Sequence, residues 1–226
     1  RNVFRIILLA ASLFILILAL PACGKSSPAS KTTTPPTTST AKVTPGPLTV
    51  LSIVGGNVLV QKPGNNQWIA GTKGMTLKVD YKIKTEAGGK ATITFFEGST
   101  IELDGETEIS LAELDLEGTA SKIKINQAIG NTVSRVKKLI DPASGFEIET
   151  SAAVVAVRGT TLSVDVDLAG VTIVDNIEGL VSVKAQGVEV TLTEGTKTTV
   201  LPGETPGKPE PVVTPTTPPP TTSAPS

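Results

Sequence analysis

The chain has 226 residues and a formal charge of −1, with no histidine, one cysteine and only 3% aromatic residues. These counts exclude Ser-His-Asp and Cys-His nucleophilic sites, histidine-containing zinc sites and an internal disulfide, and they disfavour surfaces that stack on bases or sugars. The charge is unevenly distributed, with +5 on residues 1–47 and −5 on residues 48–203. Because nucleic-acid binding needs a clustered basic surface, we expect no nucleic-acid partner.

Residues 1–22 form an apolar leader whose core runs from Ile6 to Leu20. A core of this length is typical of a signal peptide, whereas a membrane-spanning helix needs about 20 residues. The next residues, Leu20-Pro-Ala-Cys23, resemble the lipobox of bacterial lipoproteins. That resemblance implies that the Cys23 thiol receives a diacylglyceryl group and that Cys23 becomes the N-terminus after cleavage. Two alternatives stay open, an uncleaved anchor helix over 3–22 and an ordinary secretory signal.

Residues 23–47 are rich in Ser, Thr, Pro and Lys, and residues 204–226 repeat the Ser, Thr and Pro but contain one lysine and two glutamates. Such segments have little apolar surface to bury, so they are expected to stay disordered. We predict that 23–47 is a spacer whose lysines lie near anionic headgroups, and that 204–226 is a disordered tail. The expected location is therefore the cell envelope, outside the cytoplasm and anchored to the membrane.

Between these segments, residues 48–203 consist of short alternating apolar and polar runs separated by glycine turns. Alternation gives a strand one buried and one exposed face. The pattern predicts an all-β domain of short antiparallel or solenoid-like strands, in the form of a compact β-sandwich, a barrel or a β-solenoid. The positions expected on buried faces are Leu77, Val79, Tyr81, Ile83, Ile123, Ile125, Leu162, Val164, Val166, Val188, Val190 and Leu192.

Residues 131–140 are ambiguous, because Val133, Val136 and Ile140 recur at helical spacing. Since strand patterns lie on both sides, we favour a strand or a bent turn over a helix.

Two sequence blocks resemble the signatures of FecR domains. The first block is Gly88–Leu103 and the second is Ile148–Thr160, which contains Val157-Arg-Gly-Thr160 as its most specific part. In the second block Ser151 stands where the family usually has proline. Residues 68–74 and 177–183 also fit, so the resemblance extends over about 48–203 and implies a FecR-like β domain there.

FecR itself is a sensor in ferric-citrate uptake, with a cytoplasmic part that regulates a sigma factor, one membrane helix and an exterior part. Few residues precede the apolar leader here, so we expect the domain without that circuit. The resemblance therefore implies a non-catalytic interaction or scaffold module, bound to an envelope protein or polymer. The alternatives are an extracytoplasmic sensor in a transmembrane signalling pathway and a binder of glycans or small molecules.

The candidate site residues are Arg158, Gly159 and Thr160, which we interpret as structural. Arg158 has five donors that can reach a carboxylate or loop carbonyls, and Gly159 permits a bend or a close strand approach. The alternative is that Arg158 binds an anionic ligand.

Two carboxylate groupings are weaker candidates. Asp165, Asp167 and Asp175 could hold Ca²⁺, although charges on a solvated face are favoured. The pairs Glu97 with Glu102 and Glu106 with Glu108 could resemble glycosidase carboxylates, but the chain has few aromatic residues to form a sugar cleft. We therefore expect no catalytic residue, no cofactor and no bound metal.

Overall fold

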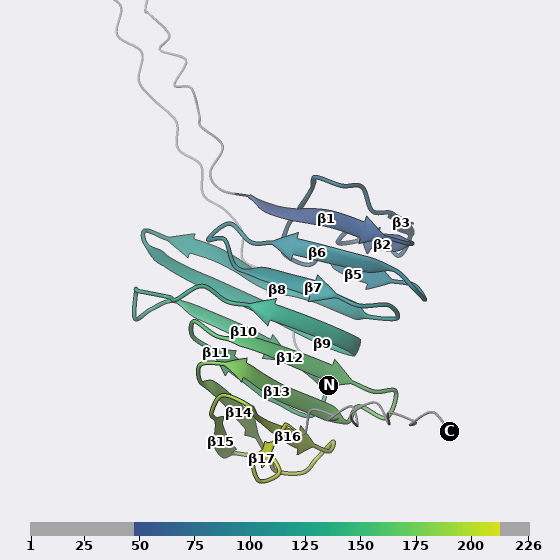
Figure 1. Ribbon diagram of the computed structural model, residues 1–226. Coiled ribbons are helices and arrows are strands. Elements are labelled where there is room, and N and C mark those ends of the chain that lie inside the picture. The colour runs from purple at the N-terminus through teal and green to yellow at the C-terminus, as the bar shows by residue number, and fades with distance from the viewer. Residues whose placement is uncertain (1–47, 213–226) are drawn as a thin grey trace, which may run out of the picture. The chain divides into compact units, whose positions relative to one another are not determined.

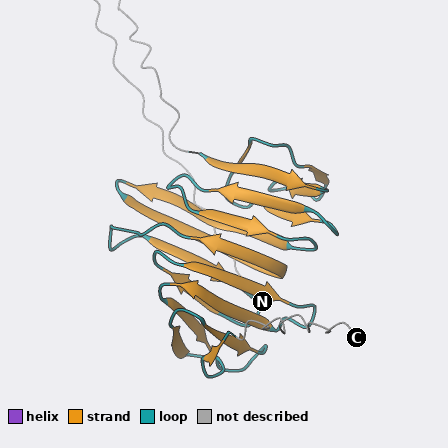
Figure 2. Ribbon diagram, in the orientation of Figure 1, coloured by secondary structure: helices purple, strands orange, loops and turns teal. Residues whose placement is uncertain are grey.

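The computed structural model describes residues 48–212, which form strands and turns and contain no helix (Figures 1 and 2). The leader, Cys23, the spacer 23–47 and the end of the tail lie outside the described residues. Hydrogen bonds connect 17 strands into one mixed sheet, which divides into two layers joined by the long strand β9 (Ala120–Arg135). None of the residues described forms a helix long and apolar enough to cross a membrane. The predicted all-β fold class is confirmed.

Each layer is a row of hydrogen-bonded strands. In spatial order, the first layer contains β4 (Met75–Leu77), β1 (Thr49–Gly55), β6 (Lys90–Thr94), β7 (Thr100–Leu103), the end of β9, β12 (Thr161–Val166), β13 (Thr172–Glu178), β16 (Thr196–Val200) and β17 (Glu210–Pro211). The second layer contains β3 (Trp68–Ala70), β2 (Val58–Gln61), β5 (Lys82–Thr85), β8 (Glu108–Glu117), the start of β9, β10 (Gly145–Glu149), β11 (Val154–Val157), β14 (Val181–Ala185) and β15 (Val188–Leu192). All pairs are antiparallel except β9 with β10.

Strand β9 passes from the second layer to the first at Gly130. Before this residue β9 pairs with β8 and β10, and from Gly130 to Arg135 it pairs with β7 and β12. Gly130 has a φ of +92°, and a Cβ added there would lie 2.5 Å from the Cα of Thr107. Only glycine therefore fits the point where the chain changes layer.

The two layers share one apolar core. The inward residues of the alternating strands, such as Ile125 and Leu162, are fully buried and belong to one cluster with residues of both layers. Phe95, which follows β6 in the first layer, meets Phe146 of β10 in the second layer edge to face, with ring centroids 5.6 Å apart. This arrangement is a two-layer sandwich in which successive hairpins alternate between the layers (Figure 1).

The predicted burial of Val79 is wrong, because its side chain is 39% exposed. The alternation from Leu77 to Ile83 is not one strand. Instead β4 ends in the first layer, the chain turns at Asp80 with a φ of +66°, and β5 begins in the second layer. Val188 is also exposed, since β15 is the last strand of its layer.

Residues 131–140 contain the last part of β9 and an irregular continuation, so the preference for a strand or a bent turn is confirmed. The structure departs from the predicted boundary at residue 203. Gly207 donates its N–H to the Thr199 carbonyl, and β17 pairs with the edge of β16. Residues up to 212 thus cover backbone groups that the edge strand would otherwise expose.

Candidate functional site

The connection between β9 and β10, residues 136–144, is the segment that we call the β9–β10 loop. Strand β9 ends in the first layer and β10 begins in the second, so the loop must cross the side of the sandwich. Pro142 cannot donate to a strand ladder, which is consistent with an irregular path. The loop runs beside three turns of the sheet, and these turns fasten it.

The N-terminal end of the loop is held by both sequence blocks. The Val136 N–H donates to the carbonyl of Thr160, at 2.9 Å, and the Lys137 N–H donates to the hydroxyl of Ser99, also at 2.9 Å. Thr160 belongs to the second block and Ser99 to the first, and both are buried. Segments about 60 residues apart in the chain therefore meet on two successive loop residues.

The C-terminal end of the loop is held by side chains. Arg158 donates from Nη2 to the carbonyl of Asp141 at 3.0 Å, and the Asp141 carboxylate accepts the Thr119 hydroxyl at 2.7 Å. The Ser144 hydroxyl accepts the N–H of Ser121 at 3.0 Å. The hydrogen bonds from Thr119 and from the Ala143 N–H, with a smaller effect of the Arg158 charge, lower the pKa of the exposed Asp141 carboxyl.

Gly159 and Thr160 complete the contact with the loop. Gly159 has a φ of +72°, and a Cβ added to it would lie 2.9 Å from the Cα of Lys138. The Thr160 hydroxyl donates to the Leu180 carbonyl at 2.9 Å, which joins the turn between β13 and β14 to the same cluster. The structure thus brings Arg158, Gly159 and Thr160 together against the loop.

The fastened loop still presents an apolar side chain to solvent. Ile140 is 92% exposed, whereas its neighbour Leu139 packs against the core. Leu180, which shares a hollow of about 360 Å³ with Arg158, is exposed as well. Two exposed apolar residues are therefore associated with Arg158, Ile140 next to its hydrogen-bond acceptor Asp141 and Leu180 in the same hollow.

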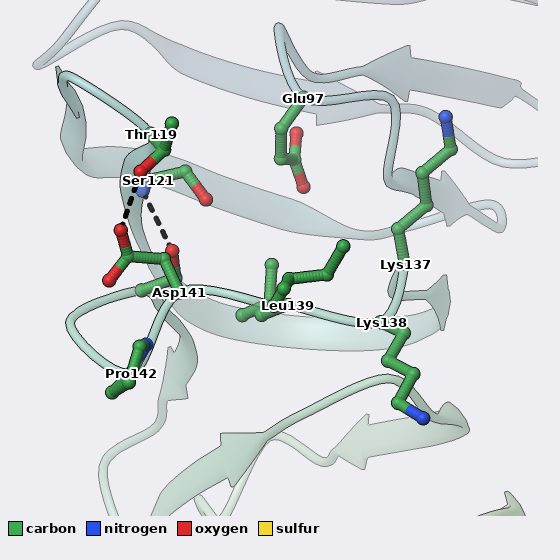
Figure 3. Close-up of a pocket in the computed structure, with 10 residues that line it drawn as sticks. Glu97, Thr119, Ser121, Lys137, Lys138, Leu139, Asp141 and Pro142 are labelled. Atoms are coloured by element: carbon green, nitrogen blue, oxygen red, sulfur yellow. Dashed lines mark hydrogen bonds between the residues drawn. The ribbon is translucent and has the colours of Figure 1, made fainter.

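A larger hollow of about 460 Å³ is lined by the loop and by two neighbouring turns (Figure 3). Glu97, in the turn between β6 and β7, points its carboxylate into this hollow (Figure 3). The other lining residues are Thr119, Ser121, Lys137, Lys138, Leu139, Ile140, Asp141, Pro142 and Ser144.

The three aspartates considered for calcium have different partners, although the charge of Asp165 also acts on Asp175. Asp167 accepts the N–H groups of Ala169 and Val171, and Asp165 accepts the side-chain amide of Asn131. Burial raises the pKa of Asp175, and Lys197 opposes this shift. Across residues 48–212, no group of three or more acidic or sulfur ligands is placed to hold a metal ion.

The acidic pairs considered as glycosidase carboxylates are also placed differently. Glu97 lines the hollow, whereas Glu102 forms an ion pair with Arg135 on the outer face of the first layer. Glu106 occupies a turn with a φ of +57°, and Glu108 begins β8. The sequence interpretation gave no role to Ser99, Thr119 or the loop. The signals present in the sequence were the Gly98-Ser99 pair of the first block and the run Leu139-Ile140-Asp141-Pro142.

Comparison with known proteins supports the resemblance. The family model described as "FecR protein" matches residues 81–182, which include both sequence blocks, so the predicted likeness to FecR domains is confirmed over this segment. No curated protein matches. Two crystal structures from Parabacteroides distasonis, each described as a "putative anti-sigma factor", are similar at 17% and 18% identity with TM-scores of 0.48 and 0.49. Each alignment covers 57% of this chain and 59% of the other, so the chain spans less than two thirds of those proteins.

Proposed function

We propose that this FecR-like protein is a non-catalytic interaction module tethered to the cell envelope, and that the β9–β10 loop is its binding surface. The observation that carries the proposal is the exposure of Ile140, 92%, in a loop held by hydrogen bonds at both ends. A loop that is already ordered loses less conformational entropy when it binds. Binding residues are commonly found on such loops, positioned by a rigid scaffold.

The chemistry around Ile140 supports this surface. A single exposed apolar residue is ordinary and needs no explanation. Here, however, Ile140 directly precedes Asp141, whose carbonyl accepts Arg158, Leu180 shares a hollow with Arg158, and two hollows border the loop. Arginine beside apolar residues is the composition enriched at the energetic centres of protein interfaces. A protein partner fits this surface better than a carbohydrate, since no aromatic residue lines the larger hollow and Phe146, which lines the smaller one, is almost fully buried.

The non-catalytic part of the proposal rests on the residues available. The larger hollow contains carboxylates, lysines and hydroxyls, and the chain has no histidine to act as a base. Three residues bring hydroxyl groups to the hollow, namely Thr119, Ser121 and Ser144. The Thr119 hydroxyl donates to the Asp141 carboxylate, but the hydrogen bonds that this carboxylate accepts lower its pKa, so it is a weak base. The hollow therefore offers no strong base for activating a hydroxyl nucleophile.

The tether concerns residues outside the described part of the chain. The leader and Cys23 support a lipid anchor, followed by a spacer that would keep the domain off the membrane. Replacing Cys23 by alanine is expected to abolish incorporation of labelled fatty acid and to leave a larger precursor. Wild-type protein that takes up no lipid would contradict the anchor.

A second candidate function is an extracytoplasmic sensor that relays a signal to a membrane partner. The match to the FecR family favours it. The two functions use the same surface and differ in the partner, which would be a membrane signalling protein in the second case.

The experiment is site-specific photocrosslinking in intact cells. A crosslinking amino acid at Ile140 should capture a defined partner, and Ile140→Asp should abolish its co-purification. Leu168 provides a matched control, because it is 93% exposed in the turn at the other end of β12. Capture of the same partner from both positions, or none from Ile140, would refute the loop as the binding surface. Capture of a membrane signalling protein would favour the sensor.

A further inference from the structure

We infer that the hollow beside the β9–β10 loop binds an organic cation, an ammonium or guanidinium group on an apolar stem, with Glu97 as its counter-ion. This site shares Ile140 with the proposed interaction surface, but it is argued from Glu97 and does not depend on partner binding by the loop.

Both carboxylate oxygens of Glu97 are buried, and neither has a hydrogen-bond partner among residues 48–212. The backbone that carries Glu97 is fixed by its turn. Phe95 donates to the Ser99 carbonyl at 2.9 Å, and Gly98 donates to the Phe95 carbonyl at 2.9 Å. A carboxylate removed from water without a partner is strongly unfavourable, so its persistence in the fold needs an explanation.

The nearby lysines do not supply that partner. The described part of the chain forms three ion pairs, and none of them includes Glu97. The Lys137 ammonium lies over Gly98, and Figure 3 shows the ammonium groups of Lys137 and Lys138 pointing away from the Glu97 carboxylate. The carboxylate faces the hollow instead (Figure 3).

The remaining lining defines what else a ligand must carry. Leu139, Ile140 and Pro142 give the hollow apolar walls, and Ser121 contributes a hydroxyl. A volume of about 460 Å³ lies within the usual range for small-molecule sites. At Glu97 an anion would be repelled, because the ammonium groups of Lys137 and Lys138 point away from this carboxylate (Figure 3), and a neutral apolar molecule would leave the carboxylate unpaired. A cation on a short apolar stem satisfies both parts of the lining, and its charged group forms a charge-assisted hydrogen bond.

Two sources can deliver this chemistry, a free alkyl cation or a lysine or arginine side chain of a polypeptide. The test titrates the full chain with n-butylammonium, with n-butylguanidinium and with a capped arginine tripeptide. Binding is followed by the NMR signals of the Leu139 and Ile140 methyl groups. We expect the methyl signals to shift until the site is saturated. Glu97→Gln should weaken the affinity at least tenfold, whereas Glu194→Gln, at an exposed turn, should leave the affinity unchanged. Response to the free cations indicates a small-molecule site, and response to the tripeptide alone indicates a polypeptide source.

The stability of the variant provides an independent measurement. Because Glu97→Gln removes an unpaired buried charge at almost constant size, the variant should melt at the same temperature as the wild type or higher. A variant that melts several degrees lower would show that the carboxylate has a partner within the fold, and this result would overturn the inference. Absence of any saturable shift, or equal binding by the glutamine variant, would overturn it as well. Neither result would affect crosslinking from Ile140, so failure here is distinguishable from failure of the interaction surface.

Discussion

Replacing Gly130 by alanine tests the point where the two layers are joined. Its φ of +92° costs an L-residue about 1–2 kcal/mol. The new methyl group would also lie 2.5 Å from the Cα and 2.7 Å from the Cβ of Thr107, and backbone atoms at these distances must move. Overpacking of this kind costs about 1–3 kcal/mol.

The same movement disturbs two hydrogen bonds. The Thr107 hydroxyl donates to the Asn131 carbonyl and accepts the Asn131 N–H, each at 3.1 Å. Such bonds contribute about 1 kcal/mol each. We therefore expect Gly130→Ala to lower the free energy of unfolding by about 3–5 kcal/mol, a large part of the 5–15 kcal/mol typical of a domain.

The assay is urea unfolding of the full chain, with Gly187→Ala as the control. Gly187 has a φ of +76° in the turn between β14 and β15, but a Cβ there would meet nothing within 4 Å. In this control the free energy of unfolding should fall only by the cost of a positive φ for alanine, about 1–2 kcal/mol. Equal losses in the two variants would mean that the crossover has room for a side chain, and the reasoning would be refuted.

Three further predictions concern the core, the loop and the outer face. Leu162→Asp should unfold the domain because the side chain is fully buried, whereas Asp165→Ser should change stability by about 0.5 kcal/mol at most; equal melting curves would contradict the strand faces. Arg158→Ala should speed amide hydrogen exchange in the β9–β10 loop about tenfold while the exchange of the core strands stays unchanged, and unaltered loop exchange would show that the arginine is dispensable. Burial raises the pKa of Asp175 in the folded state. Above this raised pKa, the ionised Asp175 carboxylate therefore destabilises the folded protein. The destabilisation disappears as the pH falls below the pKa that Asp175 has in the unfolded chain. Asp175→Asn should therefore stabilise the domain at pH 7 and not at pH 3. An equal gain in the free energy of unfolding at both pH values would contradict a raised pKa of Asp175.

The sequence was sufficient where structure depends on neighbours in the chain. The burial of Ile125 and Leu162 follows from a two-residue period, which is a local property of a strand. The period does not reveal where a strand ends and the chain changes layer. For this reason the pattern does not predict the exposure of Val79. It also does not show that only glycine fits at position 130, which follows from the close approach of Thr107.

The candidate site also combines features that a local sequence pattern reveals with features that depend on the packed structure. Arg158 stood out because it lies in a recognisable block, and its partner is a carbonyl 17 residues away that no local pattern identifies. Glu97 was considered only as one of a pair of acids. Its distinguishing property is the lack of a partner, which is a property of the packed structure.

The position of the hydrogen bonds explains why the loop exposes Ile140. The loop is held at Val136 and Lys137 by the two sequence blocks, and again at Asp141 by Arg158. The segment between these points cannot move inward, because the backbone of Gly159 already lies against the Cα of Lys138. With Leu139 turned toward the core, the next side chain is directed outward, as successive side chains are in an extended segment. The exposure of Ile140 is thus set by the fastening of the loop, and a variant that releases the loop should lose binding without any change to the isoleucine itself.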